Sequence, residues 1–129
     1  MVYDFIPGIE LTVSDVRESI LVNLKKRLAK AGIHRYKYFT TDLSKEGSKA
    51  IPLASGEGFN LIICDAPCSG SGTWGRTPEQ LSYFEESRID DYASLQKKIV
   101  SNTIPHVKPG GYFLYITCSV FKKENEDVV

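Results

Sequence analysis

The sequence has 129 residues, of which 42% are apolar and 25% charged, and this composition is ordinary for one soluble globular domain. It excludes a disordered chain, a collagen-like chain and a disulfide-stabilised miniprotein. Sixteen basic and sixteen acidic residues give a formal net charge of zero, so coating of nucleic acid by bulk positive charge has no support. No apolar run approaches the roughly 20 residues that span a bilayer, and the first residues lack the pattern of a signal peptide, so we expect no membrane association.

Residues 9–13 alternate and carry β-branched side chains, which predicts a strand that ends near residues 14–15. Apolar side chains then recur every three or four residues, which predicts an amphipathic helix that Gly32 ends. The expected apolar stripe consists of Val16, Ile20, Leu21, Leu24, Leu28 and Ala31. Tyr36 to Thr40 is predicted to be a short strand, and residues 42–58 a loop or an irregular helix.

The short apolar run at residues 59–64 is typical of a strand buried on both faces. It leads into Asp65-Ala66-Pro67-Cys68 and then into a stretch rich in serine and glycine. A second helical pattern covers residues 88–107. Its expected apolar side consists of Ile89, Tyr92, Leu95, Ile99 and either Ile104 or Thr103.

The last third of the chain repeats the order of turn, strand and helix. Residues 108–111, Lys-Pro-Gly-Gly, predict a turn, and residues 112–116 a second buried strand. This strand ends in Thr117-Cys118-Ser119, and residues 122–129 resemble the start of a helix. Because strands alternate with helices, we predict an α/β fold with an open, mainly parallel sheet.

The chain has three cysteines, Cys64, Cys68 and Cys118. An odd count is a poor disulfide framework and suits a reducing compartment, so we expect a cytoplasmic protein. Three residues separate Cys64 from Cys68, where zinc sites usually have two, and the two histidines are isolated in the sequence. We therefore predict no metal site.

Two of the cysteines follow predicted strands, at the sheet edge where open α/β folds bind ligands. A helical crossover joins the two strands, so they are expected to be parallel neighbours, with Cys68 and Cys118 facing one pocket. A thiolate is a strong nucleophile, and its use at neutral pH calls for a helix N-terminus or a cation that lowers the thiol pKa. The Asp65 carboxylate is suited to bond an amino group and a ring nitrogen of a nucleic-acid base.

Structural roles compete with these functional ones. Cys64 lies inside an apolar strand and is predicted to pack in the core. For Cys68 or Cys118 taken alone, burial of a small side chain fits as well as catalysis, and only their joint placement favours chemistry. Trp74 is expected to cover the core rather than to stack on a base. The basic residues between positions 25 and 37 are more typical of a solvated face than of an RNA track.

At residues 65–81 (DAPCSGSGTWGRTPEQL) and 115–129 (YITCSVFKKENEDVV) the sequence resembles the Sun/Fmu-type RNA (cytosine-5)-methyltransferases. Residues 11–33 are similar to the second strand and following helix of that family, and residues 108–111 fit it as well. Two cysteine motifs at matching spacing form a specific signal. The resemblance implies a Rossmann-like methyltransferase fold, in which residues 1–129 form part of an S-adenosylmethionine-dependent domain.

The resemblance also implies roles for single residues. Cys118 matches the nucleophile that attacks C6 of a cytosine, Cys68 the cysteine associated with product release, and Asp65 the residue that holds the base. Asp15 matches the residue that binds the ribose of S-adenosylmethionine, Asp42 lies by the adenine, and Asp65 is also expected beside this cofactor. The implied partner is RNA, ribosomal RNA in this family, with a single-stranded or unstacked target cytosine.

The sequence also departs from the family pattern. The family has a Gly-rich loop with a lysine, between its first strand and first helix, that has no match here, and it continues with further strands. The resemblance therefore predicts a domain truncated at both ends, inactive by itself, with little or no cofactor affinity and with sheet edges that favour self-association.

Two other functions stay open at this point. One is DNA cytosine-5 methylation, in which the proline–cysteine motif would make Cys68 the nucleophile; the motif around Cys118 argues against it. The other is a non-catalytic piece that binds RNA or oligomerises, although zero net charge argues against strong RNA binding.

Overall fold

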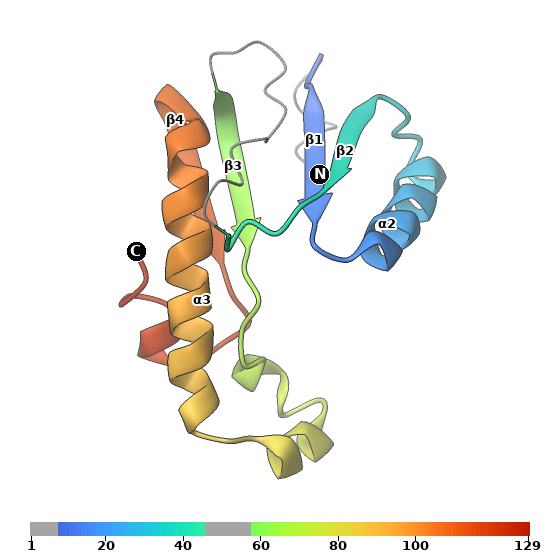
Figure 1. Ribbon diagram of the computed structural model, residues 1–129. Helices are drawn as coiled ribbons and strands as arrows, with labels where there is room; N and C mark the ends of the chain where they lie inside the picture. Colours follow the sequence, from blue (N-terminus) through green and yellow to red (C-terminus); the bar gives the residue numbers. More distant parts are fainter. Residues whose placement is uncertain (1–7, 46–57) are drawn as a thin grey trace. The chain divides into compact units, whose positions relative to one another are not determined.

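The computed structural model describes residues 8–45 and 58–129, and the chain divides into two compact units, 1–42 and 43–129. Each unit contains one pair of parallel strands joined by a helix (Figure 1). The predicted α/β class and parallel pairing are therefore confirmed, while the four strands in the described ranges are hydrogen-bonded as two separate pairs. Among the described helices, none combines the length and apolar character needed to cross a membrane.

The first unit is a strand–helix–strand motif made of β1 (Leu11–Asp15), α2 (Glu18–Lys30) and β2 (Tyr36–Thr40). β1 and β2 are parallel, and their pairing runs from Leu11 opposite Tyr36 to Asp15 opposite Thr40. The bounds of β2 agree with the sequence-based expectation. Because the strands are parallel and in register, both end at the same edge of the pair.

The buried side of α2 differs in part from the predicted stripe. Leu21 and Leu28 are buried, two turns apart, as expected of one helix face. Val16 lies before the first helical turn and is exposed, and Ile20 and Ala31 are exposed as well, so these three expectations were wrong.

Gly32 ends α2 as predicted. It adopts a left-handed backbone conformation, with φ of +73°, which glycine tolerates without steric cost. Its N–H donates to the carbonyl of Ala29 at 3.0 Å, and the next N–H, of Ile33, donates to that of Leu28 at 2.9 Å. These two bonds satisfy carbonyls at the helix end, and Ile33, the residue after the glycine, is buried.

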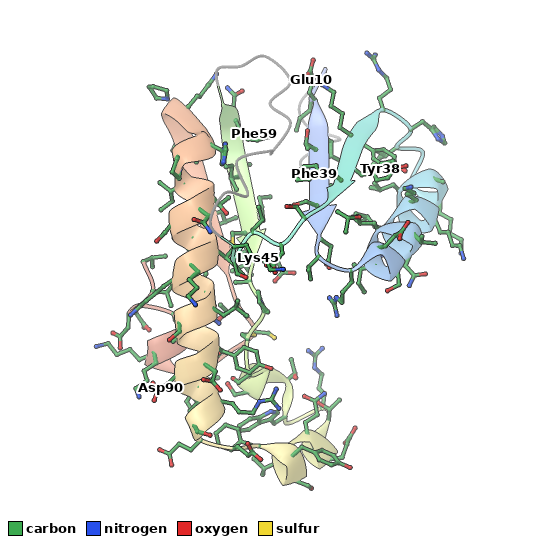
Figure 2. The ribbon with its side chains drawn as sticks, viewed as in Figure 1. Glu10, Tyr38, Phe39, Lys45, Phe59 and Asp90 are labelled. Atoms are coloured by element: carbon green, nitrogen blue, oxygen red, sulfur yellow. The ribbon has the colours of Figure 1, made fainter. Side chains whose placement is uncertain are left out.

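The basic side of the first unit is partly occupied by contacts within the unit. The ammonium of Lys25 on α2 lies 3.3 Å from the centre of the Tyr38 ring on β2, which is labelled in Figure 2. Such a contact between a cation and an aromatic face is favourable at a solvated surface.

The second unit contains β3 (Phe59–Asp65), α3 (Ser87–Thr103) and β4 (Val107–Ile116). β3 and β4 are parallel, as the helical crossover predicts, and Asp65 lies opposite Ile116 at their carboxyl ends. Between β3 and α3 lie two short 3₁₀ helices, Ser71–Thr73 and Pro78–Tyr83.

The prediction that both strands of this unit are buried on both faces was wrong. Cys64 is buried, but its strand neighbours Leu61 and Ile63 are exposed. The exposed apolar side chains of β4 are Tyr112, Leu114 and Ile116. Side chains of a strand point alternately to its two faces, and along most of both strands exposed positions alternate with less exposed ones, so one face is packed more closely than the other.

Helix α3 ends at Thr103, four residues earlier than predicted. Pro105 lacks an N–H and restricts Ile104, so the α-helix gives way to a single 3₁₀ turn. The buried stripe is Ile89, Ala93, Gln96, Val100 and Thr103. Only two of these residues belong to the predicted apolar side: Ile89, and Thr103, which was predicted as an alternative to Ile104.

The Lys-Pro-Gly-Gly segment does not precede the last strand but lies within β4. Val107 pairs with Phe59 and Tyr112 pairs with Leu61, so the segment forms an irregularity between two paired regions. A Cβ atom on Gly111 would lie 2.9 Å from the carbonyl oxygen of Phe59, closer than real Cβ contacts allow. Glycine is required there by the approach of the two backbones.

The start of a helix predicted at residues 122–129 is a short 3₁₀ helix, Lys122–Glu124, followed by turns. Side-chain hydrogen bonds to the preceding loop, described below, hold this segment in place of a longer helix.

The substitution Gly111→Ala is expected to lower the free energy of unfolding by about 1–3 kcal/mol, because the added methyl group must displace strand backbone. Urea denaturation measures the difference. Gly75→Ala is the matched control, since a Cβ atom there meets nothing within 4 Å. Equal stability of the two variants would contradict the argument from close approach.

Candidate active site

The thiols of Cys68 and Cys118 lie side by side, with their sulfur atoms 3.2 Å apart. Cys68 follows the end of β3 by three residues, and Cys118 follows the end of β4 by two. Both are free thiols; Cys68 is half-buried and Cys118 is exposed. The structure therefore confirms that the two strand ends bring together cysteines 50 residues apart in sequence.

Backbone hydrogen bonds join the two loops that carry these cysteines. Ala66 N–H donates to the carbonyl of Ile116 at 2.9 Å, and Gly72 N–H donates to that of Cys118 at 2.9 Å. A Cβ atom on Gly72 would lie 2.9 Å from the same Cys118 oxygen, so only glycine permits this approach.

Three serines form a hydroxyl cluster beneath the loops. The Ser71 and Ser119 oxygens lie 3.1 Å apart, and Ser69 lies 3.2 Å from Ser71 and 3.3 Å from Ser119. Ser71 is buried and accepts a hydrogen bond from Val120 N–H at 2.9 Å. Because the hydroxyls rotate and both donate and accept, the cluster adds further cross-links between the loops.

Glu124 is a buried carboxylate that the sequence interpretation missed. It has no exposed surface and accepts three hydrogen bonds. The donors are the Ser69 N–H at 2.8 Å, the Ser119 hydroxyl at 3.0 Å and the Gln96 amide at 3.2 Å. Gln96, on α3, is also fully buried and donates from the same nitrogen to the carbonyl of Pro67 at 2.8 Å.

Asn125 holds the loop after β4 in a turn. Its side-chain N–H groups donate to the carbonyls of Ser119 at 3.0 Å and Phe121 at 2.9 Å, and its oxygen accepts from the Thr117 hydroxyl. The Tyr115 hydroxyl donates to the backbone oxygen of Glu124 at 2.8 Å. The residues after the second cysteine therefore brace the loop that carries it.

One signal for this network was available in the sequence. Gln96 lies on the same helical face as Ile89, Ala93 and Val100, so a stripe shifted by one position contains a polar residue. A polar residue in a buried stripe requires a hydrogen-bond partner. No local pattern indicates that the partner is Glu124, 28 residues further along the chain.

The pKa of Cys118 is raised rather than lowered, which contradicts the sequence expectation. The hydrogen bond with Cys68 is the largest cause, followed by partial burial and the charge of Cys68; Asp65 adds to the effect. The 3₁₀ helix that follows has only three residues. The two lysines of that helix form ion pairs instead, Lys122 with Asp127 and Lys123 with Asp90 (labelled in Figure 2).

One further predicted site residue, Asp65, and two residues with predicted structural roles, Cys64 and Trp74, also lie in this unit. Asp65 is the last residue of β3 and is exposed. Cys64 is buried, and burial raises the pKa of its thiol, so its expected role in the core is confirmed. Trp74 packs against Phe84 at 4.8 Å and Phe121 at 6.0 Å between ring centres, and all three side chains are half-buried, so they form an aromatic cluster outside the fully buried core.

Asp15 and Asp42 belong to the first unit. Asp15 is the last residue of β1, and Asp42 follows the end of β2 by two residues. One Asp15 oxygen accepts from the backbone N–H of Arg17 at 2.8 Å and from its guanidinium at 3.3 Å. Because β1 and β2 are parallel and in register, both carboxylates belong to the carboxyl edge of this strand pair.

Within residues 8–45 and 58–129, no cluster of three or more histidine, cysteine or acidic residues is arranged to hold a metal ion.

A family model described as 16S rRNA methyltransferase RsmB/F matches residues 9–129. The chain belongs to this family. The similarity to the Sun/Fmu-type enzymes, drawn from the two cysteine motifs, is thereby confirmed.

Three relatives illustrate the match to the family. The ribosomal RNA small subunit methyltransferase F of Shewanella loihica is 40% identical over 72 residues, covering 56% of this chain and 15% of that protein. The corresponding protein of Salmonella paratyphi A is 31% identical over 116 residues, covering 87% and 24%. The 28S rRNA (cytosine-C(5))-methyltransferase of Mus musculus is 37% identical over 101 residues, covering 75% and 13%. The chain thus spans at most about a quarter of these relatives.

Solved structures confirm the Rossmann-like methyltransferase fold. The crystal structure of PH0851 has a TM-score of 0.80 and 33% identity, over 92% of this chain and 26% of that one. The structure of NSun6 from Pyrococcus horikoshii with SFG has a TM-score of 0.76 and 24% identity, over 92% of this chain and 28% of that one.

The substitution Cys68→Ala is expected to lower the pKa of Cys118, because it removes both the hydrogen bond and the neighbouring charge that raise it. Alkylation by iodoacetamide, followed peptide by peptide across pH, reports the thiolate fraction. The midpoint for Cys118 moves to lower pH in the variant. Cys64→Ala is the control and leaves the midpoint in place; an unmoved midpoint in Cys68→Ala would show that the two thiols are not coupled.

Proposed function

We propose that this chain carries the catalytic cysteines of an RNA cytosine-5 methyltransferase that acts on ribosomal RNA. The observation that supports this most directly is the 3.2 Å separation of two free thiols beyond the ends of adjacent parallel strands. The names of the relatives, which are ribosomal RNA methyltransferases, support the substrate class. The proposal extends to residues 9–129 as part of one methyltransferase domain.

In the proposed reaction the exposed Cys118 is the nucleophile. Its sulfur forms a bond to C6 of the cytosine, which makes C5 nucleophilic enough to accept a methyl group. Transfer of the C5 proton to a base, a role that we assign to the Cys68 sulfur, then allows the C6–S bond to break and returns the Cys118 thiolate. The attack requires Cys118 as the thiolate, and in the free protein the hydrogen bond with Cys68 raises the pKa of this thiol.

Cys68 is the residue that we assign to product release. Its sulfur lies next to the one that would bind C6, so it is close to the bond that must break. Asp65 is assigned to the base, since an exposed carboxylate accepts hydrogen bonds from the cytosine amino group. The base must leave its stack to reach an exposed pair of thiols at a strand end, which favours single-stranded or unpaired RNA.

The cofactor that we propose is S-adenosylmethionine, which supplies an activated methyl group. The first unit offers a suitable set of acceptors, because Asp15 and Asp42 follow neighbouring parallel strands. Asp15 is assigned to the ribose hydroxyls and Asp42 to the adenine amino group, both of which donate to carboxylates. We assign Asp65 to S-adenosylmethionine binding as well as to binding of the target cytosine. The reaction needs reduced thiols, so we place it in the cytoplasm.

DNA cytosine-5 methylation is the less favoured alternative. It would make Cys68 the nucleophile, but Cys68 is half-buried whereas Cys118 is exposed. The relatives are named for ribosomal RNA, which also argues for RNA.

Cys68→Ala in the full-length protein is expected to accumulate a covalent RNA adduct, because attack proceeds while release is blocked. Denaturing gel electrophoresis with labelled ribosomal RNA detects it as a retarded band. The double variant Cys68→Ala/Cys118→Ala should give no adduct, and the Cys64→Ala control should turn over without accumulation. An adduct that persists without Cys118 would overturn the assignment of the nucleophile, and an adduct with DNA alone would overturn the substrate class.

Asp15→Asn and Asp42→Asn are each expected to weaken S-adenosylmethionine binding by about tenfold in the full-length protein, roughly the worth of one hydrogen bond to a charged group. Isothermal titration measures the dissociation constants. Glu10→Gln is the control, because Glu10 (labelled in Figure 2) is an exposed carboxylate that precedes β1. Unchanged affinity in both aspartate variants would remove these residues from the cofactor site.

A further inference from the structure

A single buried carboxylate connects the two loops that carry the cysteines. One Glu124 oxygen accepts from the N–H of Ser69, the residue after Cys68, and the other accepts from the hydroxyl of Ser119, the residue after Cys118. We infer that Glu124 is a positioning residue that holds the two thiols at their observed separation. The effect of this residue on catalysis rests on the function proposed above. Its effect on the separation of the thiols does not depend on that function.

The environment of Glu124 supports this role. The side chain is completely buried, and no ion pair within the described ranges includes it. Burying a carboxylate is costly unless its oxygens are hydrogen-bonded, and here three neutral donors from three different segments do so. A fully bonded buried group of this kind favours one arrangement of the segments around it.

Gln96 extends the network to the other side of Cys68. Its amide nitrogen donates both to Glu124 and to the carbonyl of Pro67, the residue before Cys68. The backbone is therefore held on both sides of the first cysteine, at Pro67 by α3 and at Ser69 by Glu124. Because both neighbours of Cys68 are held, the backbone at Cys68 has little freedom to move, and this restricts the position of its sulfur.

The second cysteine is held in a similar way. The Ser119 hydroxyl, which donates to Glu124, also accepts from Phe121 N–H at 3.1 Å, so it is fixed within its turn. Gly72 N–H binds the Cys118 carbonyl independently of Glu124. Loss of Glu124 should therefore loosen the spacing of the thiols without abolishing the contact between the loops.

The consequence for chemistry follows from the short distance involved. Cys118 must reach a substrate carbon while Cys68 stays close to the bond that forms, and an error on the order of 1 Å in either loop reduces such a reaction strongly. Among the described residues, Glu124 makes no hydrogen bond to either sulfur. It therefore acts through the residues that follow the cysteines, the backbone N–H of Ser69 and the hydroxyl of Ser119.

Phenylarsine oxide provides a test that needs neither RNA nor cofactor. Its trivalent arsenic forms bonds to two thiol sulfurs, with loss of both protons and release of one water, and holds the sulfurs close to the separation seen here. In the full-length protein, protection of Cys68 and Cys118 from maleimide is measured by peptide mass spectrometry against arsenical concentration. The result is a dissociation constant for the pair of thiols.

The comparison uses Glu124→Ala, Glu124→Gln and the matched control Glu126→Ala, which removes an exposed carboxylate two residues away. Glu124→Ala should raise the dissociation constant by about tenfold, the worth of roughly one charge-assisted hydrogen bond. Glu124→Gln should stay within about threefold of the parent, because glutamine can accept from Ser69 and Gln96 with its oxygen and donate to Ser119 with its nitrogen. Glu126→Ala should leave the constant unchanged.

Equal dissociation constants for the parent and Glu124→Ala would overturn the inference, and so would a Glu124→Gln variant as weak as Glu124→Ala. If Glu124→Ala has no cooperative thermal transition, Ser119→Ala decides by comparison with Ser71→Ala, since both remove hydroxyl contacts within the serine cluster but only Ser119→Ala removes a hydrogen bond to the Glu124 carboxylate. Binding in Ser119→Ala no weaker than in Ser71→Ala then overturns the inference, and weaker binding supports it. A protein that bridges arsenic as expected but does not methylate RNA would contradict the proposed function and leave the positioning role intact.

Discussion

The parallel hydrogen bonding of β3 and β4 is the constraint on which the candidate site depends. Asp65 lies opposite Ile116, and Ala66 N–H continues the pairing to the Ile116 carbonyl, so both chains leave the sheet at one edge. If the two strands were antiparallel, their following loops would leave at opposite edges, separated by the length of a strand. Parallel pairing is therefore what brings the thiols within 3.2 Å of each other.

Hydrogen bonds between polar groups hold the two cysteine-bearing loops in a defined arrangement at this edge. The three serines and the carboxylate of Glu124 connect the two loops through side chains, while Gly72 does so through the backbone. Within this geometry, the hydrogen bond with Cys68 is the largest reason that the pKa of Cys118 is raised. A pair arranged in this way is suited to a reaction in which one sulfur binds the substrate while the other remains adjacent.

Sequence reasoning succeeded where a feature depends on neighbouring residues. The strand Tyr36–Thr40, the end of α2 at Gly32 and the core position of Cys64 follow from local composition and turn chemistry. It failed where another segment decides the outcome. The inward face of α3 includes Gln96 because Glu124 and Pro67 accept hydrogen bonds from its amide nitrogen, and no apolar pattern reveals such partners.

The sequence by itself determined the family and the alternation of strands and helices, because motif spacing and periodicity are local properties of the chain. The rule that a helical crossover joins parallel strands then predicted that Cys68 and Cys118 follow neighbouring strand ends. Only the tertiary structure decided which groups hold the thiols and how their protons are bound. Hydrogen bonds that cross 28 and 55 residues, from Gln96 and Ser69 to Glu124, depend on how distant segments meet. The raised pKa of Cys118 likewise arises from a neighbour 50 residues away, which only the folded chain brings into contact.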